Sequence, residues 1–281
     1  MRNAEHGGVL AGVLVAITSL AAAMPASAAD LPAKAPVLRA PPAAVNWTGF
    51  YVGANAGYAW GKTDVRASAT PAFGPEFQDY FNSNGTFGLK PKGFVGGAQA
   101  GFNYQIGVWV YGLEADVQNF NATASRDTGI IAAPVGQTGG FQDKFDTSWL
   151  VTIRPRLGVT IDRALIYATG GMAIAELKLS QQSSICSSGL CLAHLDGAAS
   201  STKVGWVVGG GVEHALTGNW SVKAEYLYVD FGTMGLRRFF VDITGLHQEL
   251  FIDNTANLRA HIARFGVNYK FYSDGPIIAK Y

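Results

Sequence analysis

Charge, cysteine and long apolar runs are all scarce in this chain of 281 residues. Only 15% of the residues are charged, the formal net charge is +1, and no Lys/Arg cluster occurs, which argues against a nucleic-acid partner. After an apolar run at the amino terminus, no stretch suits a transmembrane helix, which needs about 20 apolar residues. Glycine is abundant and aromatics reach 12%. This composition is unusual for a soluble protein of this size.

Cysteine occurs only at Cys186 and Cys191, which are separated by a flexible four-residue spacer. Two thiols at this spacing in an exported chain predict a small loop disulfide rather than free thiols. A metal site is disfavoured, because a closed site needs four ligands and His194 is the only further candidate nearby.

Catalytic motifs are also missing. The sequence has no Gly-x-Ser-x-Gly and no His-Glu-x-x-His, and the histidines after the amino-terminal apolar run, His194, His214, His247 and His261, are isolated. A nucleophile, a base and an orienting acid would have to meet at one rim of the protein. We therefore expect no enzymatic activity and no cofactor.

The amino terminus is typical of a secretory signal peptide, with Arg2, an apolar run over 9–24, and the small-residue site 26–28. We predict a signal peptide over 1–29; a retained anchor is the alternative. Residues 30–46 are rich in Ala and Pro, which favours an extended periplasmic leader. A barrel domain over 47–271 and a periplasmic tail over 272–281 complete the predicted organisation.

Eight segments alternate between apolar and polar residues, and their connections are alternately long and short. The first begins at Trp47 or Gly49, and the others cover 93–104, 108–118, 147–160, 164–178, 202–216, 220–231 and 258–271. Long loops are predicted over 61–92, 119–146, 179–201 and 232–256, and short turns at 105–107, 162–163 and 217–219. This pattern is typical of an all-β, eight-stranded antiparallel up-and-down transmembrane β-barrel.

The alternation assigns an apolar face to lipid and a polar face to the lumen. It leaves the phase of 164–178 open, and Pro155 predicts a local bulge. The predicted inward charges are Glu114, Asp116, Arg154, Arg156, Glu213, Lys223, Glu225 and Arg264. A barrel of eight strands is just wide enough to be filled by side chains, so we expect an ion-pair network. A gated narrow pathway is the alternative.

All six tryptophans fall at predicted strand ends, which indicates two aromatic girdles at the membrane boundaries. They are Trp47, Trp60, Trp109, Trp149, Trp206 and Trp220.

The predicted long loops also carry aromatic and apolar residues. These are Phe73, Phe77, Tyr80, Phe81 and Phe87 in the first loop, and Phe239, Phe240, Leu246, Leu250 and Phe251 in the fourth. The simpler interpretation is packing of loop against loop. The alternative is a binding surface for a host molecule, a lipid or an envelope protein.

Four segments carry a resemblance to a known family. The opening at 46–53, together with 167–171, 220–226 and 266–271, is similar to small alphaproteobacterial outer-membrane β-barrel proteins of the RopB type, OmpA-like eight-stranded barrels. The resemblance implies an outer-membrane location and roles in envelope integrity and surface exposure. Porin activity and haem or host-factor binding are described for some relatives, but no motif here carries those residues over. The resemblance also implies an assembly signal on the last strand, at Tyr269 and Phe271. This chain departs from that pattern by continuing over 272–281, so either Phe271 is recognised internally or Tyr281 takes part.

Three functions compete at this point. The first is a non-enzymatic outer-membrane barrel that supports envelope structure and surface interaction, and the second is a narrow porin. The third is a soluble lipocalin-like carrier, which would place its apolar face inside. The expected partners of the first are outer-membrane lipid and lipopolysaccharide, the barrel-assembly machinery, and host or envelope surface factors.

Overall fold

The computed structural model describes residues 45–242 and 245–271, without the side chains of 192, 241, 242 and 245–249. The predicted signal peptide, residues 30–44 of the predicted leader, and the predicted tail from 272 onward lie outside the described residues, as do the side chains of Leu246 and His247. No helix in the described part of the chain is long and apolar enough to cross a membrane.

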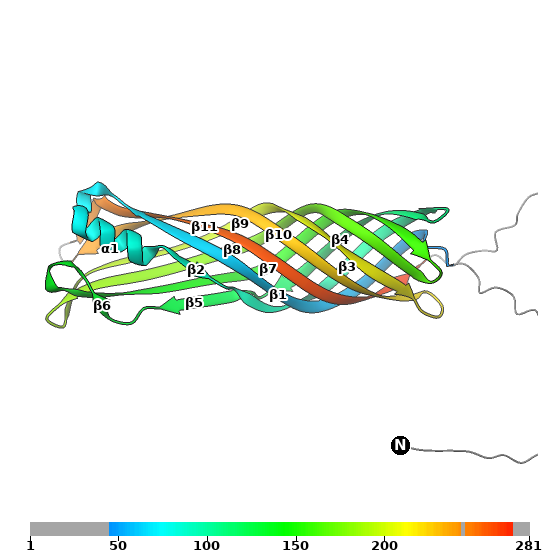
Figure 1. Cartoon of the computed structure of the whole chain (residues 1–281), viewed down its shortest axis with the longest axis horizontal. Coiled ribbons are helices and arrows are strands. Elements are labelled where there is room, and N and C mark those ends of the chain that lie inside the picture. Colours follow the sequence, from blue (N-terminus) through cyan, green and yellow to red (C-terminus); the bar gives the residue numbers. More distant parts are fainter. Residues whose placement is uncertain (1–44, 243–244, 272–281) are drawn as a thin grey trace, which may run out of the picture. The chain divides into compact units, whose positions relative to one another are not determined.

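Eight long antiparallel strands close into a ring (Figure 1). In ring order they are β1 (Gly49–Ala69), β3 (Lys92–Ile106), β4 (Trp109–Phe120), β7 (Thr138–Ile161), β8 (Ala164–Ser187), β9 (Leu190–Ala215), β10 (Trp220–Asp242) and β11 (Gly245–Lys270). The ring is closed by β11, which pairs with β1 along 19 residue pairs from Tyr51–Lys270 to Ala69–Ile252. The predicted fold class is therefore confirmed.

Tight turns join the strands at one end of the barrel, which we call the short-turn end. They lie at the predicted positions, and each contains a residue with positive φ: Gly107 (59°), Asp162 (52°) and Gly218 (69°). Glycine and, less readily, aspartate adopt this backbone conformation, which two-residue hairpin turns require.

The predicted bounds of the four long loops at the other end, the capped end, are wrong, although long connections remain between β1 and β3 and between β4 and β7. The segment predicted as a loop over 179–201 consists of β8 and β9, joined by a turn at Ser188 and Gly189. Strands β1, β7, β10 and β11 likewise continue into the predicted loops. The remaining elements there are η1 (Pro71–Phe73), α1 (Pro75–Gly85), β2 (Phe87–Leu89), β5 (Thr123–Asp127), β6 (Ile131–Ala132) and η2 (Pro134–Gly136).

The polarity of the two strand faces reverses along the barrel, which is why these strands resemble loops in the sequence. Outward residues of β8 are apolar up to Met172 and polar from Lys178 onward, whereas the inward Leu177 and Leu179 are buried. On β11, Arg264 points inward near the short-turn end, and Leu258 takes the inward position further along. The period of two is kept, but the apolar face changes sides.

The outward apolar residues define an exposed band around the short-turn half of the barrel. Phe94 and Phe265 are 78% and 74% exposed within it, as expected for side chains that contact lipid. Beyond the band, an apolar layer of buried side chains, among them Val65, Phe145 and Leu177, fills the interior.

Beyond the band the pairing between neighbouring strands is sparse at two places in the wall. The β9–β10 ladder stops at Trp206–Asp230 and resumes at His194–Val241, with no pair between these points among the described residues. On the opposite side, β5 joins β3 at one pair, Lys92–Thr123. The strands remain one continuous sheet around the apolar layer, because β9 and β10 pair again near the capped end.

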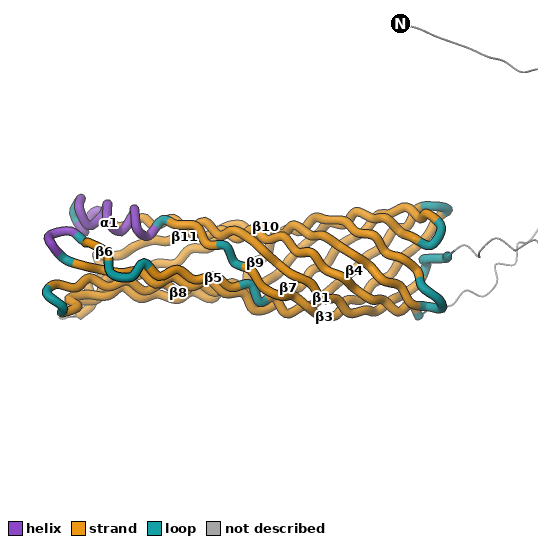
Figure 2. The backbone as a smooth tube through the Cα atoms, turned by 60° about the horizontal axis from the view of Figure 1, so that its bottom comes forward, coloured by secondary structure: helices purple, strands orange, loops and turns teal. Residues whose placement is uncertain are grey.

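Aromatic residues close the capped end, where Figure 2 shows α1 lying over the strand ends. Tyr80 and Phe81 of α1 are buried and lie 5.6 and 6.2 Å from the ring of Phe141. Phe73 contacts both Phe81 and Phe240, at 5.0 and 5.7 Å between ring centres. Phe73 and Phe240 thus pack the first predicted loop against the fourth, as in the simpler interpretation, whereas Phe239 is exposed and contacts Phe251 of its own segment.

Pro155 does not produce the predicted bulge. The pairing of β4 with β7 runs without interruption through Leu113–Pro155, and the irregularity in β7–β8 falls between Thr147 and Leu150 instead. Pro155 lies on the exposed face, and its carbonyl accepts a hydrogen bond from Thr169 Oγ1 at 2.9 Å. Along this fully described stretch, the β7–β8 ladder keeps its register but has no residue pair between Ile153–Met172 and Arg156–Thr169, so the proline interrupts the ladder without a bulge.

Asp143 is a buried carboxylate inside the capped half, outside the band. It is 2% exposed, accepts a hydrogen bond from Gln181 Nε2 at 2.9 Å, and lies 3.5 Å from Arg126 Nη1. Burial raises the pKa of the Asp143 carboxyl, and these two contacts together with the charge of the buried Arg238 only partly oppose the effect. Because the pKa is raised on folding, the ionised form costs stability at neutral pH, and this cost disappears as the pH falls through the raised pKa.

We therefore expect Asp143→Asn to raise the midpoint temperature of unfolding at pH 7.5, because asparagine keeps the acceptor for Gln181 without the buried charge. The gain should shrink as the pH is lowered and wild-type Asp143 takes up its proton. The measurement is heat-induced unfolding in detergent at several pH values. A variant less stable than wild type at neutral pH would contradict the expectation.

Candidate functional site: the charge network of the lumen

Arg154 lies at the centre of a cluster of charges inside the band. Its Nη2 donates to Glu114 Oε1 at 2.7 Å and to Asp116 Oδ2 at 2.8 Å, and its Nη1 lies 3.2 Å from Glu225 Oε1. These three carboxylates come from β4 and β10, and the Arg154 side chain is fully buried. The contacts are short, as expected for charge-assisted hydrogen bonds.

Three further cations complete the network. Lys223 Nζ donates to both oxygens of Glu114 at 2.7 and 2.8 Å. Arg264 Nη2 lies 2.6 Å from Glu225 Oε2 and 3.1 Å from Asp116 Oδ2. Arg156 Nη1 donates to Glu213 Oε2 at 3.0 Å. The structure thus brings all eight predicted lumen residues together, with four carboxylates facing four cations.

Strand register explains why these charges meet. Glu114 lies directly opposite Arg154 in the β4–β7 ladder, and Glu225 lies directly opposite Arg264 in β10–β11. Opposite charges at facing positions stabilise a sheet. A register slip of one residue would turn every one of these side chains toward lipid.

Two tyrosines belong to the network, although the sequence analysis did not assign them to it. Tyr51 Oη donates to Glu114 Oε2 at 2.7 Å, and Tyr167 Oη donates to Glu225 Oε1 at 2.9 Å. The Arg156 guanidinium lies over both rings, 4.7 and 5.2 Å from their centres. Their signal in the sequence was a large aromatic residue on an otherwise small or polar face.

Glycines make room for these rings. A Cβ atom at Gly101 would lie 2.3 Å from Tyr51 Oη, and one at Gly211 would lie 2.7 Å from Tyr167 Oη. The glycines inside the strands therefore act as close-packing sites around the network.

The lumen is closed on both sides of the network. At the short-turn end, Trp47 packs inside against Val110, Leu165 and Tyr167, and its backbone N–H donates to Gln105 Oε1 at 2.8 Å. On the other side lies the apolar layer. The assignment of Trp47 to a girdle is therefore wrong: it precedes β1 and is not held to the outward face, so it folds into the barrel mouth. Of the remaining tryptophans, Trp60, Trp109, Trp206 and Trp220 are exposed and Trp149 is half-buried.

The predicted assembly residues lie at the short-turn end of β11. Phe271 is 60% exposed, and its ring lies 5.5 Å from that of Tyr269. Tyr269 in turn contacts Trp220 at 5.0 Å. Both residues are thus part of the outward aromatic surface at this end.

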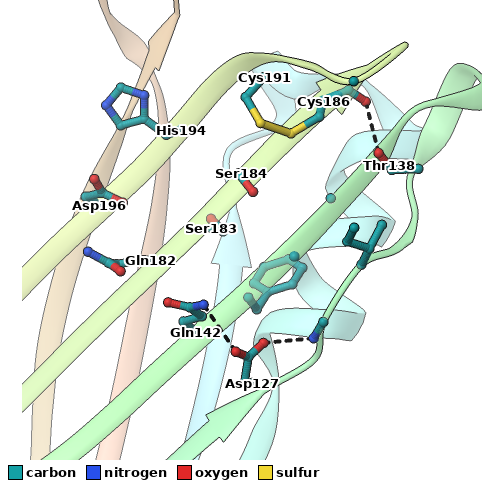
Figure 3. A pocket seen from close by; sticks show the side chains of 16 residues that line it. Asp127, Thr138, Gln142, Gln182, Ser183, Ser184, Cys186, Cys191, His194 and Asp196 are labelled. Atoms are coloured by element: carbon teal, nitrogen blue, oxygen red, sulfur yellow. Dashed lines mark hydrogen bonds between the residues drawn. A yellow bond between two sulfur atoms is a disulfide. The ribbon is translucent and has the colours of Figure 1, made fainter.

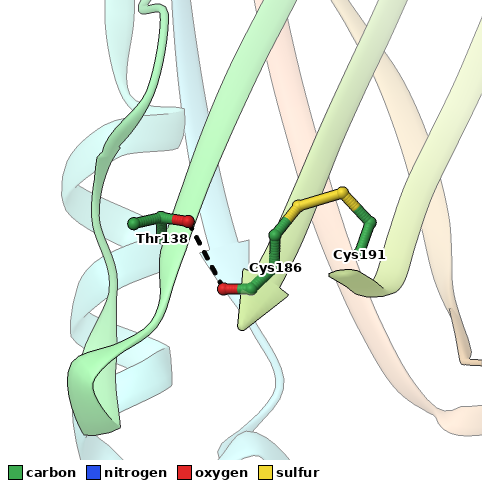
Figure 4. Close-up of a disulfide and its surroundings, with 3 residues drawn as sticks. All are labelled: Thr138, Cys186 and Cys191. Atoms are coloured by element: carbon green, nitrogen blue, oxygen red, sulfur yellow. Dashed lines mark hydrogen bonds between the residues drawn. A yellow bond between two sulfur atoms is a disulfide. The ribbon is translucent and has the colours of Figure 1, made fainter. Parts of the chain in front are cut away.

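The predicted disulfide between Cys186 and Cys191 is confirmed, and it closes the β8–β9 hairpin (Figure 4). Beside it, strands β7–β9 and residues near β5 enclose an open groove of about 600 Å³ (Figure 3). Polar side chains line this groove, including Asp127, Gln142, Gln182, His194 and Asp196. No group of His, Cys, Asp and Glu in the described ranges could hold a metal ion.

A protein-family model decides the relationship. Residues 14–271 match the family described as outer membrane protein beta-barrel domain. The chain belongs to this family. It is an outer-membrane protein, and by the general rule for such barrels its short-turn end faces the periplasm. A soluble lipocalin-like carrier is incompatible with this location.

Two curated relatives support the assignment. The 31 kDa outer-membrane immunogenic protein of Brucella melitensis biotype 1 is 36% identical over 263 residues, covering 92% of this chain and 95% of the relative. The 22 kDa outer membrane protein of Rhizobium leguminosarum bv. viciae is 30% identical over 186 residues, covering 66% and 65%. The predicted resemblance to alphaproteobacterial outer-membrane barrels is confirmed.

Among solved structures, Neisserial surface protein A is similar, with a TM-score of 0.35 and 18% sequence identity. The match covers 80% of this chain and 98% of that protein. The outer membrane protease OmpT from Escherichia coli has a TM-score of 0.42 and 10% identity, over 79% and 97%. Neither likeness bears on the function of this protein.

Removing Arg154 should destabilise the barrel strongly. We expect Arg154→Ala to cost about 3–5 kcal/mol, because the carboxylates of Glu114, Asp116 and Glu225 would lose their shared partner while remaining buried. Arg66→Ala, at an exposed position of β1, is the matched control and should change stability by less than about 0.5 kcal/mol. Urea unfolding in detergent measures the stability of both variants. Equal midpoint urea concentrations for Arg154→Ala and Arg66→Ala would refute the central role of Arg154.

Proposed function

We propose that this protein is a non-enzymatic, non-conducting outer-membrane barrel that supports envelope structure and presents its capped end for surface contacts. The observation that carries the proposal is the closed lumen, in which a balanced charge network lies between Trp47 and the apolar layer. All eight charged side chains are at most 4% exposed, which supports a role in stability rather than in binding a substrate. The missing catalytic motifs also support a non-enzymatic role.

Conduction would require a costly rearrangement. A water-filled path must separate buried ion pairs, and each uncompensated buried charge costs about 3–5 kcal/mol. Water would also have to enter the apolar layer, where Phe120, Phe145 and Leu150 have no measurable exposure. Both costs favour a barrel that does not conduct and that acts through its outer surface and its capped end.

The alternative, a narrow porin, is favoured by one observation. Several network atoms have no hydrogen-bond partner, including Arg154 Nε, Arg156 Nη2 and Asp116 Oδ1. The network therefore has donors and acceptors available for a second set of pairings, through which small solutes would have to pass.

The proposed partners follow from three surfaces. Outer-membrane lipid and lipopolysaccharide would contact the band and its edges. The barrel-assembly machinery would contact Tyr269 and Phe271 at the short-turn end. Host or envelope surface factors would contact the capped end, where Ile130 and Leu190 are exposed beside the groove.

Planar-bilayer recordings separate the two functions. The refolded protein should be electrically silent, and Trp47→Ala should be silent too, because the apolar layer still closes the other side. Discrete openings in wild type would support the porin. The folded fraction, measured by the heat-dependent mobility shift on gels, shows that silence does not come from unfolded protein.

Deleting residues 272–281 tests how the barrel is assembled. If the machinery recognises Phe271 inside the chain, the truncated protein should reach the outer membrane in the same amount as wild type. Phe271→Ala in the full chain should reduce that amount, whereas Phe94→Ala, another exposed phenylalanine, serves as the control. If the truncated protein is missing from the outer membrane while Phe271→Ala reaches it in the normal amount, the assembly signal lies in the tail instead.

A further inference from the structure

Charged side chains begin where the exposed apolar band ends on the capped side. On most strands the change occurs within two to four residues of an outward apolar or aromatic side chain, as with Trp60 and Lys62 on β1. These boundary charges are Lys62, Lys92, Asp146, Glu176, Lys178, Asp230 and Arg259. They mark the level of the head groups in the outer leaflet.

On one wall, boundary charges of the same sign face each other. Lys62 of β1 lies directly opposite Arg259 of β11, and their side chains are 64% and 56% exposed. Facing like charges destabilise a sheet. Asp64 and Asp230 compensate in part, at 2.8 and 3.3 Å from the respective cations.

Two more lysines add to this excess. Lys90 and Lys92 are exposed, and the backbone N–H of Gly61 donates to Pro91 O at 2.8 Å, which holds them beside Lys62. Neither lysine makes an ion pair with any residue in the described part of the chain. We call Lys62, Lys90, Lys92 and Arg259 the cationic patch. Its four cations exceed the two nearby carboxylates by two charges.

The opposite wall is arranged differently at the same boundary. Asp146 of β7 lies directly opposite Lys178 of β8, so unlike charges face each other. Lys144 pairs with Asp146 at 2.9 Å, and Lys178 pairs with Glu176 at 3.4 Å. Two cations and two carboxylates balance on β7 and β8, and the half-buried Lys203 of β9 lies opposite Ala175 next to them. The excess of exposed positive charge is thus on β11, β1 and the start of β3.

An aromatic cluster lies next to the cationic patch, on the band side. Trp60 stacks on His261 with 5.7 Å between ring centres, and Tyr226 Oη lies 2.6 Å from His261 Nδ1. Below them, Tyr58 and the highly exposed Phe94 contact each other edge to face at 5.4 Å. Cations above amphipathic aromatic rings suit a ligand with an anionic head and apolar chains.

We propose that the cationic patch binds the anionic sugar head of an outer-leaflet glycolipid through its phosphate or carboxylate groups, with the acyl chains lying along Tyr58 and Phe94. The bound anion relieves the repulsion between Lys62 and Arg259. Arginine provides paired donors for such a group, and the lysines add point charges. This site depends on the membrane location alone and holds whether or not the lumen conducts.

The test uses the full-length protein in a neutral detergent, titrated with diphosphoryl lipid A. The midpoint temperature of unfolding reports binding, because a ligand of the folded state raises it by mass action. Wild type should show a saturable rise that weakens at high salt. Lys62→Gln/Arg259→Gln should bind about tenfold more weakly, as expected for the loss of about 1.4 kcal/mol.

The matched control is Lys144→Gln/Lys178→Gln, which also removes two cations and leaves two carboxylates, but on the balanced wall. It should retain wild-type affinity, as should Lys62→Arg/Arg259→Lys, which keeps both charges and guards against a folding defect. An equal loss of affinity in the two double Gln variants, or no rise in the midpoint temperature of wild type, would overturn the proposal. An equal rise with phosphatidylglycerol at matched charge would overturn the assignment to a glycolipid.

Discussion

The change of surroundings along the barrel, from lipid to water, is the constraint on which the other features of this structure depend. In lipid the wall must be apolar outside, so polar and charged side chains collect in the lumen. In water the same strands must be polar outside, so leucine and phenylalanine turn inward. Because the strands keep their period of two, Tyr167 and Leu177 lie on the same face of β8 and yet belong to opposite kinds of interior.

This constraint explains the closed lumen. A narrow interior that must hold the polar residues has little room for water, so its charges have to satisfy each other. The network meets this requirement by spreading each carboxylate over several donors: Glu114 contacts Arg154, Lys223 and Tyr51. The apolar layer above it results from the same strands after their polarity has reversed. The charge network and the apolar layer thus both follow from the same alternation of inward and outward residues.

The same reversal sets the limit of what the sequence predicts. Within the band, alternation places Glu114 and Arg154 inside correctly, because lipid leaves only one choice for the outward residues. Beyond the band, an inverted alternation with mixed polar residues, such as 196–203 of β9, resembles a loop. Trp47 was misplaced for another reason: no neighbouring strand fixes its face, and its destination depends on the space left at the barrel mouth.

The charges in the lumen and the charges at the edge of the band have different roles, the first in stability and the second in recognition. Charges in the lumen, such as Glu114 and Arg154 or Glu225 and Arg264, face each other across a ladder and are buried, so they serve the stability of the fold. Charges at the outer edge of the band are exposed and face lipid head groups, where an imbalance is tolerated because the membrane itself can supply the counter-charge. The facing pair Lys62 and Arg259 is therefore unfavourable for an isolated barrel and favourable for a barrel surrounded by anionic glycolipid.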